Sequence, residues 1–125
     1  MEKVESHQDA ATAPVRLYYT GWSSSTGEAD WGLRPLFAGD KTPPSMYNIS
    51  YYKNPTVDAD IMKALGTTDR AEKTKLYTEV QEEIWKDAPW AFLVTEKLLY
   101  ATSKKLTGMY VMPDANYFFE EIDLQ

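Results

Sequence analysis

The pattern of apolar and polar residues predicts a strand, a loop and an irregular excursion in the first half of the chain. Residues 15–20 are rich in β-branched and aromatic side chains and predict a strand that Gly21 closes. Small and hydroxyl-bearing side chains dominate residues 22–30, which predict a loop. A short helical turn is expected over residues 31–37, and the consecutive prolines within residues 38–54 predict irregular structure there.

Two helices with clear start and stop signals follow. The first is expected over residues 55–66, with Asn54 as its N-cap. The second is expected over residues 69–88, with Asp69 at its start, because Pro89 cannot continue it. Apolar residues at helical spacing are expected to be buried between these helices, namely Val57, Ile61, Ala64 and Leu65 in the first and Leu76, Tyr77, Val80 and Ile84 in the second.

Further strands are expected after the helices. Residues 90–94 form a continuous apolar run, which is typical of a strand covered on both faces. Residues 98–102, 108–112 and 118–122 predict three more strands. Residues 1–13 carry no periodicity and are expected to form a disordered tail or linker. The order of elements predicts an α+β fold in which two helices pack on mixed β-strands.

Composition narrows the classes of partner. The chain has 125 residues, enough for one hydrophobic core, and 14% of them are aromatic, which favours a dense core or a binding cleft. Its net charge is −6 and its basic residues are scattered, so neither nucleic acid nor an anionic membrane surface is an expected partner. The chain contains no cysteine, which excludes disulfides and zinc–thiolate sites.

Candidate catalytic residues find little support. The single histidine, His7, lies in the expected tail, so neither a histidine-based triad nor a multi-histidine metal site is expected. The serines lack the surroundings of a nucleophile elbow. Glu28 and Asp30 could be considered as a hydrolytic carboxylate pair, but such spacing is common by chance in acidic chains. We therefore expect no catalytic residue, no metal site and no cofactor, and a small hydrolase is the least favoured alternative.

The loop after Gly21 is the remaining candidate site. An indole beside consecutive hydroxyl groups offers a flat apolar face and several short hydrogen-bonding groups, which suits a small polar ligand. The same composition also fits a turn with a half-buried tryptophan and solvated serines, and the residues alone leave both interpretations open. The candidate ligand-binding residues are Trp22, Ser23, Ser24, Ser25 and Thr26.

Three stretches resemble one protein family. The sequence GWSSSTGEADW at 21–31, the Y-x-N-P-x-V-D pattern at 52–58 and the A-E-K-x-x-L-Y-x-x-x-Q pattern at 71–81 are similar to the C-terminal portion of the peptide-binding (type 5) extracytoplasmic solute-binding proteins of ABC importers. The first stretch and the ending at 96–125 (EKL…SKKLTG…MPD…DLQ) most resemble the glutathione-binding subgroup. The likeness extends from about Val15 to Gln125.

This resemblance implies the C-terminal fragment of a two-lobed fold like that of periplasmic binding proteins. It implies a periplasmic location, with a signal peptide expected upstream of this chain. Residues 14–104 would form part of the C-terminal ligand-binding lobe, and residues 105–125 would return toward the N-terminal lobe. The whole protein would bind glutathione or a short peptide without catalysis and deliver it to the membrane permease of an ABC importer.

The resemblance also bears on single residues. Trp22 falls where related dipeptide and oligopeptide binders have a tryptophan lining the peptide pocket. Ser25 falls where they carry an aspartate that pairs with the α-amino group of the peptide, and a neutral hydroxyl cannot supply that charge-assisted bond. The γ-linkage of glutathione places an amine and a carboxylate together, so this departure favours the glutathione subgroup.

Two expectations remain beside this one. A stand-alone structural or protein-interaction module that reuses the helix pair is the alternative function. The segments 108–112 and 118–122 are also expected to lack strand partners within the chain, because the resemblance places those partners in the N-terminal part. Unpaired edges template association, so the chain is expected to self-associate through its C-terminal strands or to leave them poorly ordered.

Overall fold

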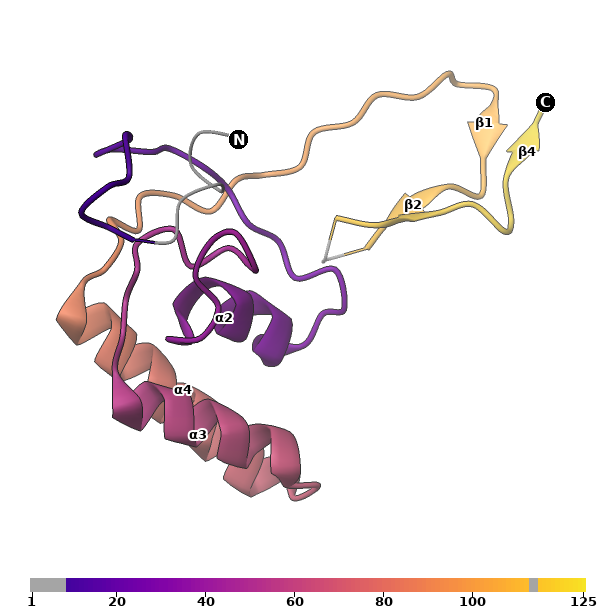
Figure 1. Cartoon of the computed structure of the whole chain (residues 1–125). Helices are drawn as coiled ribbons and strands as arrows, with labels where there is room; N and C mark the ends of the chain where they lie inside the picture. Colours follow the sequence, from indigo (N-terminus) through magenta and orange to yellow (C-terminus); the bar gives the residue numbers. More distant parts are fainter. Residues whose placement is uncertain (1–8, 113–114) are drawn as a thin grey trace.

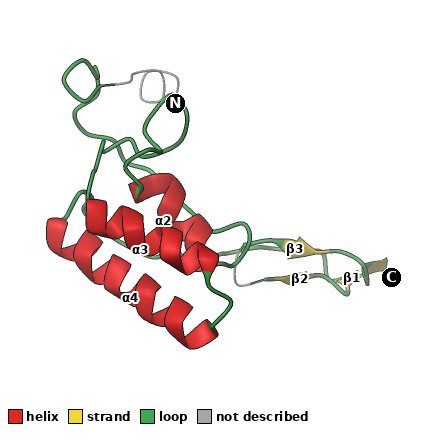
Figure 2. Ribbon diagram, turned by 60° about the horizontal axis from the view of Figure 1, so that its bottom comes forward, coloured by secondary structure: helices red, strands yellow, loops and turns green. Residues whose placement is uncertain are grey.

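The chain consists of a group of packed helices and, over residues 106–124, two short pairs of strands that we call the ribbon. The computed structural model describes residues 9–112 and 115–125. Figures 1 and 2 show the ribbon extending away from the helices toward the C-terminus. The elements in the described residues are the helices α2 (Ala29–Phe37), α3 (Pro55–Gly66) and α4 (Arg70–Asp87) and the strands β1 (Leu106–Thr107), β2 (Tyr110–Val111), β3 (Tyr117–Phe118) and β4 (Asp123–Leu124). The expected α+β class is confirmed.

The two predicted helices are confirmed, together with their caps. The side chain of Asn54 accepts hydrogen bonds from the backbone N–H groups of Thr56 and Val57 at the start of α3. Asp69 does the same for Ala71 and Glu72 at the start of α4. These caps satisfy N–H groups that have no partner within a helix, so the local sequence determines where each helix begins.

The core lies where the three helices meet. The predicted apolar residues of α3 and α4 are buried, except Leu65, which is 43% exposed. The prediction that Leu65 belongs to the core is wrong. Leu65 lies about 100° around the helix from Ala64, and it is Ala64 that packs beside Leu76 and Tyr77. The end of α2 adds Leu36 and Phe37 to the same core. Among the described residues, no helix is both long enough and apolar enough to cross a bilayer.

The irregular excursion between α2 and α3 is confirmed, and one buried amide holds it. The side chain of Asn48 is fully buried. Its Nδ2 donates to the carbonyl oxygens of Ala38 (3.0 Å) and Tyr52 (2.8 Å). Its Oδ1 accepts from Ser50 Oγ (3.0 Å) and from the backbone N–H of Tyr52 (3.1 Å). Asn48 therefore supplies bonds that a regular element would otherwise provide.

The end of α4 is tied to the start of α3. A carboxylate oxygen of Asp87 accepts from the Tyr52 hydroxyl at 2.6 Å and from Asn54 Nδ2 at 2.8 Å. Burial, followed by the bond to Asp87, raises the pKa of Tyr52 to about 12. The bond from Tyr52, followed by that from Asn54, holds the pKa of Asp87 below its usual value. Asn54 thus both caps α3 and contacts α4.

The terminal strands pair with one another. Strand β1 pairs antiparallel with β4, with Leu106 opposite Leu124, and β2 pairs antiparallel with β3, with Tyr110 opposite Phe118. The strands expected at 108–112 and 118–122 are thus present in part, as β2 and β3. The expectation that these segments find no partner within the chain is wrong, because β2 and β3 pair with each other.

Three other predicted strands are wrong. Residues 15–20, 90–94 and 98–102 belong to no helix or strand. Most of their large side chains are exposed, with Leu17 and Leu99 each at 93%, whereas Trp90 is half-buried and packs against the core. An apolar run becomes a strand only when a neighbouring strand supplies backbone hydrogen bonds, and the described residues place no strand beside these three segments. The helices accordingly pack on one another, and no helix contacts a strand among the described elements.

Candidate functional site

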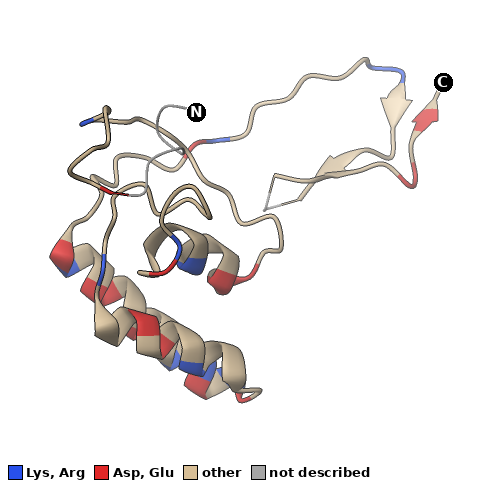
Figure 3. Ribbon diagram, viewed as in Figure 1, with Lys and Arg blue, Asp and Glu red and all other residues tan. Residues whose placement is uncertain are grey.

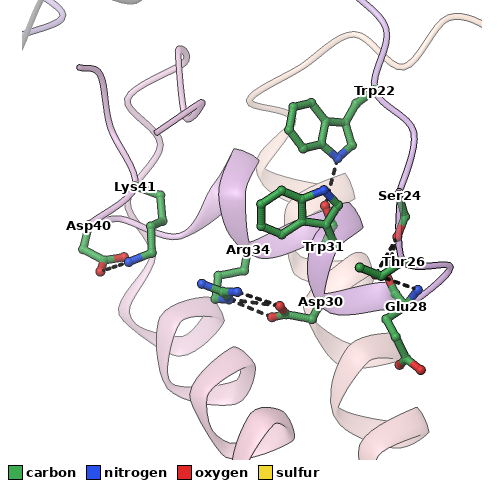
Figure 4. Close-up of polar contacts among 9 residues, drawn as sticks. All are labelled: Trp22, Ser24, Thr26, Glu28, Asp30, Trp31, Arg34, Asp40 and Lys41. Atoms are coloured by element: carbon green, nitrogen blue, oxygen red, sulfur yellow. Dashed lines mark hydrogen bonds and ion pairs between the residues drawn. The ribbon is translucent and has the colours of Figure 1, made fainter. Parts of the chain in front are cut away.

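The candidate loop leads directly into α2, and its tryptophan is fixed by that helix. The indole Nε1 of Trp22 donates to the carbonyl oxygen of Trp31 at 2.8 Å (Figure 4). In a helix that carbonyl would accept from the residue four positions later, but that residue is Pro35, which has no N–H. The proline therefore leaves an acceptor available, and Trp22 uses it.

Aromatic neighbours complete the surroundings of Trp22. The ring of Tyr47 lies 5.1 Å from it, and the ring of Trp31 lies 6.1 Å from it, both tilted. Tilted rings at these separations attract one another. The Trp22 side chain remains 36% exposed, so part of the indole is open to solvent. An indole that is held on one side and open on the other can form the wall of a binding site.

Two of the candidate hydroxyl groups are engaged within the loop. Ser24 Oγ donates to the carbonyl oxygen of Glu28 at 2.8 Å, and Thr26 Oγ1 accepts from the backbone N–H of Glu28 at 3.2 Å. The N–H of Gly27 also donates to the carbonyl of Ser24 at 3.3 Å. Ser24 and Thr26 therefore shape the turn before α2, and any part they have in ligand binding is combined with that local role.

Ser23 and Ser25 are exposed on the same loop. The ribbon approaches the loop here, because Asn116 Nδ2 lies 3.5 Å from the carbonyl oxygen of Ser25. A donor at that distance forms a weak hydrogen bond at most. This is still a contact between residues 91 positions apart in the sequence. The loop is thus bordered by α2 on one side and by the ribbon on the other.

The acidic residues near the loop do not form a carboxylate pair. Asp30 receives three bonds from Arg34, two from Nε at 2.8 and 3.1 Å and one from Nη2 at 2.8 Å. The bond to Asp30 raises the pKa of Arg34. Figure 4 shows the Glu28 side chain directed away from this ion pair. Asp30 therefore stabilises α2, and the two carboxylates do not face a common space.

Other chemistry is sparse around the loop. Within residues 9–112 and 115–125 no cluster of histidine, cysteine, aspartate and glutamate could hold a metal ion. His7 lies outside the described residues. A shallow, open depression lies on α4, lined by Thr78, Gln81, Glu82 and Trp85, and none of the candidate loop residues lines it. Figure 3 shows acidic and basic residues interspersed on α3 and α4.

Sequence comparison identifies relatives of this chain. No family model matches it. It is 62% identical over 110 residues to the glutathione-binding protein GsiB of Pectobacterium atrosepticum. It is 54% identical over 111 residues to the proteins of the same name from Salmonella typhimurium and Escherichia coli K12. The chain is homologous to part of these glutathione-binding proteins.

The match covers most of this chain but only a small part of each relative. It includes 88–89% of this chain but only 21–22% of the relatives, so the chain spans about a fifth of their length. The resemblance to the glutathione-binding subgroup of the type 5 solute-binding proteins is thereby confirmed, and it is consistent with the C-terminal portion of such a protein. The similarity of GWSSSTGEADW to that subgroup agrees with these relatives.

The residues that position Trp22 were not predicted from the sequence. Pro35, Trp31 and Tyr47 were not singled out, although a proline four residues after Trp31 is a readable signal of an unpaired helical carbonyl. Tyr47 lies in the irregular excursion, where no periodicity indicates which side chains approach the loop. Asn116 was also missed, because its approach depends on the course of the ribbon.

Proposed function

We propose that this chain is the C-terminal part of the substrate-binding component of an ABC importer for glutathione or a short peptide. The ligand binds without covalent chemistry and passes to the membrane permease of the importer, and the protein acts in the periplasm. The 62% identity to a glutathione-binding protein supports this function. The observation that carries it is the fixed, partly open indole of Trp22, with the exposed serines beside it.

The chemistry of the loop fits glutathione better than an ordinary peptide. Ser25 offers a neutral hydroxyl where binding an α-amino group alone would call for a carboxylate. The γ-glutamyl end of glutathione carries an amine and a carboxylate on one carbon, and this pair is neutral overall. A hydroxyl can donate to the carboxylate and accept from the amine. The partly exposed indole of Trp22 would cover the apolar stretch between the two ends of the ligand.

A chimaera tests this function. The matching 110-residue segment of the Pectobacterium atrosepticum protein is replaced by this chain's residues, and glutathione binding is measured by calorimetry. We expect binding, and we expect Trp22→Ala to weaken it by about 1–3 kcal/mol, the scale for removing an aromatic wall from a desolvated pocket. Met62→Ala is the control, because Met62 is 64% exposed on α3. A folded chimaera that does not bind glutathione would contradict the proposed function.

A further inference from the structure

Trp22 and Tyr47, which we call the ring pair, are both held by the last turn of α2. Pro35 has no N–H, so the carbonyl oxygen of Trp31 is left to accept from the Trp22 indole at 2.8 Å (Figure 4). The carbonyl oxygen of Pro35 in turn accepts from the backbone N–H of Tyr47 at 3.2 Å. Two side chains that are distant in the sequence are therefore fixed against the same part of one helix.

The backbone next to Tyr47 is also held by the core. The following residue is Asn48, whose fully buried side chain donates to the carbonyl oxygens of Ala38 and Tyr52. The N–H of Asn48 donates to the carbonyl oxygen of Lys41 at 2.8 Å. The ring pair thus rests on backbone that is ordered before any ligand binds, and this lowers the conformational entropy lost on binding.

The ring pair offers a ligand aromatic surface. Its ring centroids lie 5.1 Å apart, with the planes tilted by 49°. Trp22 is 36% exposed and Tyr47 is 39% exposed, so each ring keeps part of its surface in solvent. The one donor of the Trp22 indole is already used by the Trp31 carbonyl. The indole can therefore meet a ligand only with its ring surface, which favours an apolar or aromatic group.

The middle of glutathione would lie beside this surface. In the function proposed above, the hydroxyl of Ser25 binds the γ-glutamyl end, and the indole of Trp22 covers the stretch between the two ends. That stretch is the cysteinyl residue, and its sulfur projects from the backbone of the ligand. Because Tyr47 lies directly beside Trp22, an aromatic group attached to the sulfur through one carbon has the reach to contact both rings.

We propose that the ring pair binds the sulfur substituent of glutathione thioethers, so that the ligands of this site include S-aryl and S-arylalkyl conjugates of glutathione. The aromatic substituent packs on Trp22 and Tyr47 and buries apolar area that glutathione itself lacks. Conjugates with such a substituent therefore bind more tightly than glutathione. This inference rests on the proposed function, because it takes the glutathione part of the ligand to occupy the same loop.

Calorimetry on the chimaera described above tests the inference with glutathione, S-methylglutathione and S-benzylglutathione. The two thioethers both lack the free thiol, so the ratio of their affinities isolates the contribution of the ring. We expect S-benzylglutathione to bind about tenfold more tightly than S-methylglutathione, the scale for one added aromatic contact. Tyr47→Ala should bring this ratio close to one. Tyr47→Phe, which keeps the ring, should preserve it, as should Met62→Ala on the exposed surface of α3.

The outcomes separate this inference from the proposed function. If glutathione binds but the two thioethers bind equally, the ring pair does not select the substituent and the inference is overturned, while the proposed function stands. A preference for S-benzylglutathione that survives Tyr47→Ala would overturn it in the same way, because the benzyl group would then be bound elsewhere. A folded chimaera that binds none of the three compounds would contradict both.

The full chain provides a second measurement for the case in which the chimaera does not fold. Its indole N–H signals are followed by NMR, and the Trp22 signal is assigned with Trp22→Phe. We expect millimolar S-benzylglutathione to shift the Trp22 signal and S-methylglutathione at the same concentration to leave it in place. Tyr47→Ala should abolish the shift, with the amide signals of α3 and α4 reporting that the chain remains folded. No shift in the unaltered chain, or equal shifts with the two thioethers, would refute the inference.

Discussion

The carboxylate of Asp87 bonds the end of α4 to the residues just before α3. It accepts from Tyr52 and from Asn54, so one side chain connects the end of α4 to the segment that begins α3. Tyr52 also packs against the core, with its ring 6.4 Å from that of Phe37 in an edge-to-face arrangement. A change at this residue alters hydrogen bonding and packing together. Tyr52→Phe separates the two, because it removes only the hydroxyl.

The stability of the chain is therefore expected to depend on pH through Tyr52. Its pKa of about 12 in the folded chain exceeds the usual value of about 10, so the stabilisation is complete below pH 10 and is lost as the pH rises toward 12. We expect the unfolding free energies of the unaltered chain and Tyr52→Phe to converge over that range. Urea titrations at a series of pH values measure this.

Asp87 gives the opposite dependence at low pH. Its pKa is lowered in the folded chain, so its contribution is present above the ordinary aspartate value and is lost as the pH falls through the folded value. The same titrations, extended to acid, test it with Asp87→Asn.

The Tyr52 prediction has its own contradicting outcome. If the difference in unfolding free energy between Tyr52→Phe and the unaltered chain were constant from pH 8 to pH 12, the hydroxyl bond would not contribute as described.

At the scale of elements, the proline inside α2 leaves a helix carbonyl without its usual N–H partner, and that carbonyl accepts the bond from Trp22. Pro35→Ala would supply an N–H for the Trp31 carbonyl and so compete with the indole of Trp22. We expect the Trp22 indole N–H to exchange faster with solvent, followed by NMR, and glutathione binding by the chimaera to weaken. Gly32→Ala is the matched control, because a Cβ there meets nothing within 4 Å. An unchanged Trp22 signal in Pro35→Ala would remove the proline from this role.

The ribbon depends on one glycine. Gly108 has a φ of +76°, and a Cβ added there would lie 1.7 Å from the carbonyl oxygen of Glu121. Gly108→Ala is therefore expected to break the pairing of β1 with β4, seen as loss of protection of the Gln125 amide, which donates to the carbonyl oxygen of Lys105. Gly27 has a φ of +68° but no atom within 4 Å, so Gly27→Ala tests strain alone, about 1–2 kcal/mol. Equal effects of the two substitutions would contradict the steric argument.

The sequence predicted well those elements whose ends depend on nearby residues. Asn54 and Asp69 cap helices through groups two or three residues away, so the local sequence was sufficient. Residues 15–20 and 90–94 were predicted as strands because their composition is that of strands, but a strand requires a distant partner. The same holds for the candidate site. Trp22 was predicted from the composition of its loop, whereas Tyr47 and Asn116 come near the loop only because of the tertiary fold.

At the scale of the whole molecule, the helices and the ribbon are connected mainly by the chain itself. No helix contacts a strand among the described elements, and the weak approach of Asn116 to Ser25 is a link between them. The division of the chain near residue 105 into lobe and terminal strands stays a prediction. Each pair of strands in the ribbon leaves its two outer edges unpaired.

Self-association through these outer edges is therefore still expected. The isolated chain should show an apparent mass that rises with concentration in light scattering. Gly108→Ala, which disrupts the ribbon, should change that dependence, whereas Gly27→Ala should not. Hydrogen exchange would then protect residues in 105–125 and leave 91–102 fast. A single monomeric mass at all concentrations would contradict the expectation.

The buried amide of Asn48 has a consequence for how the chain can be produced. Asn48, Ile49 and Ser50 form an Asn-x-Ser triplet, which eukaryotic secretory cells recognise for glycosylation. A sugar is attached to the same Nδ2 that donates to Ala38 and Tyr52, and the folded chain leaves no exposed surface there. Glycosylation during synthesis would therefore prevent the excursion from closing over the core. A bacterial host, or Ser50→Ala with its one lost hydrogen bond, avoids that outcome.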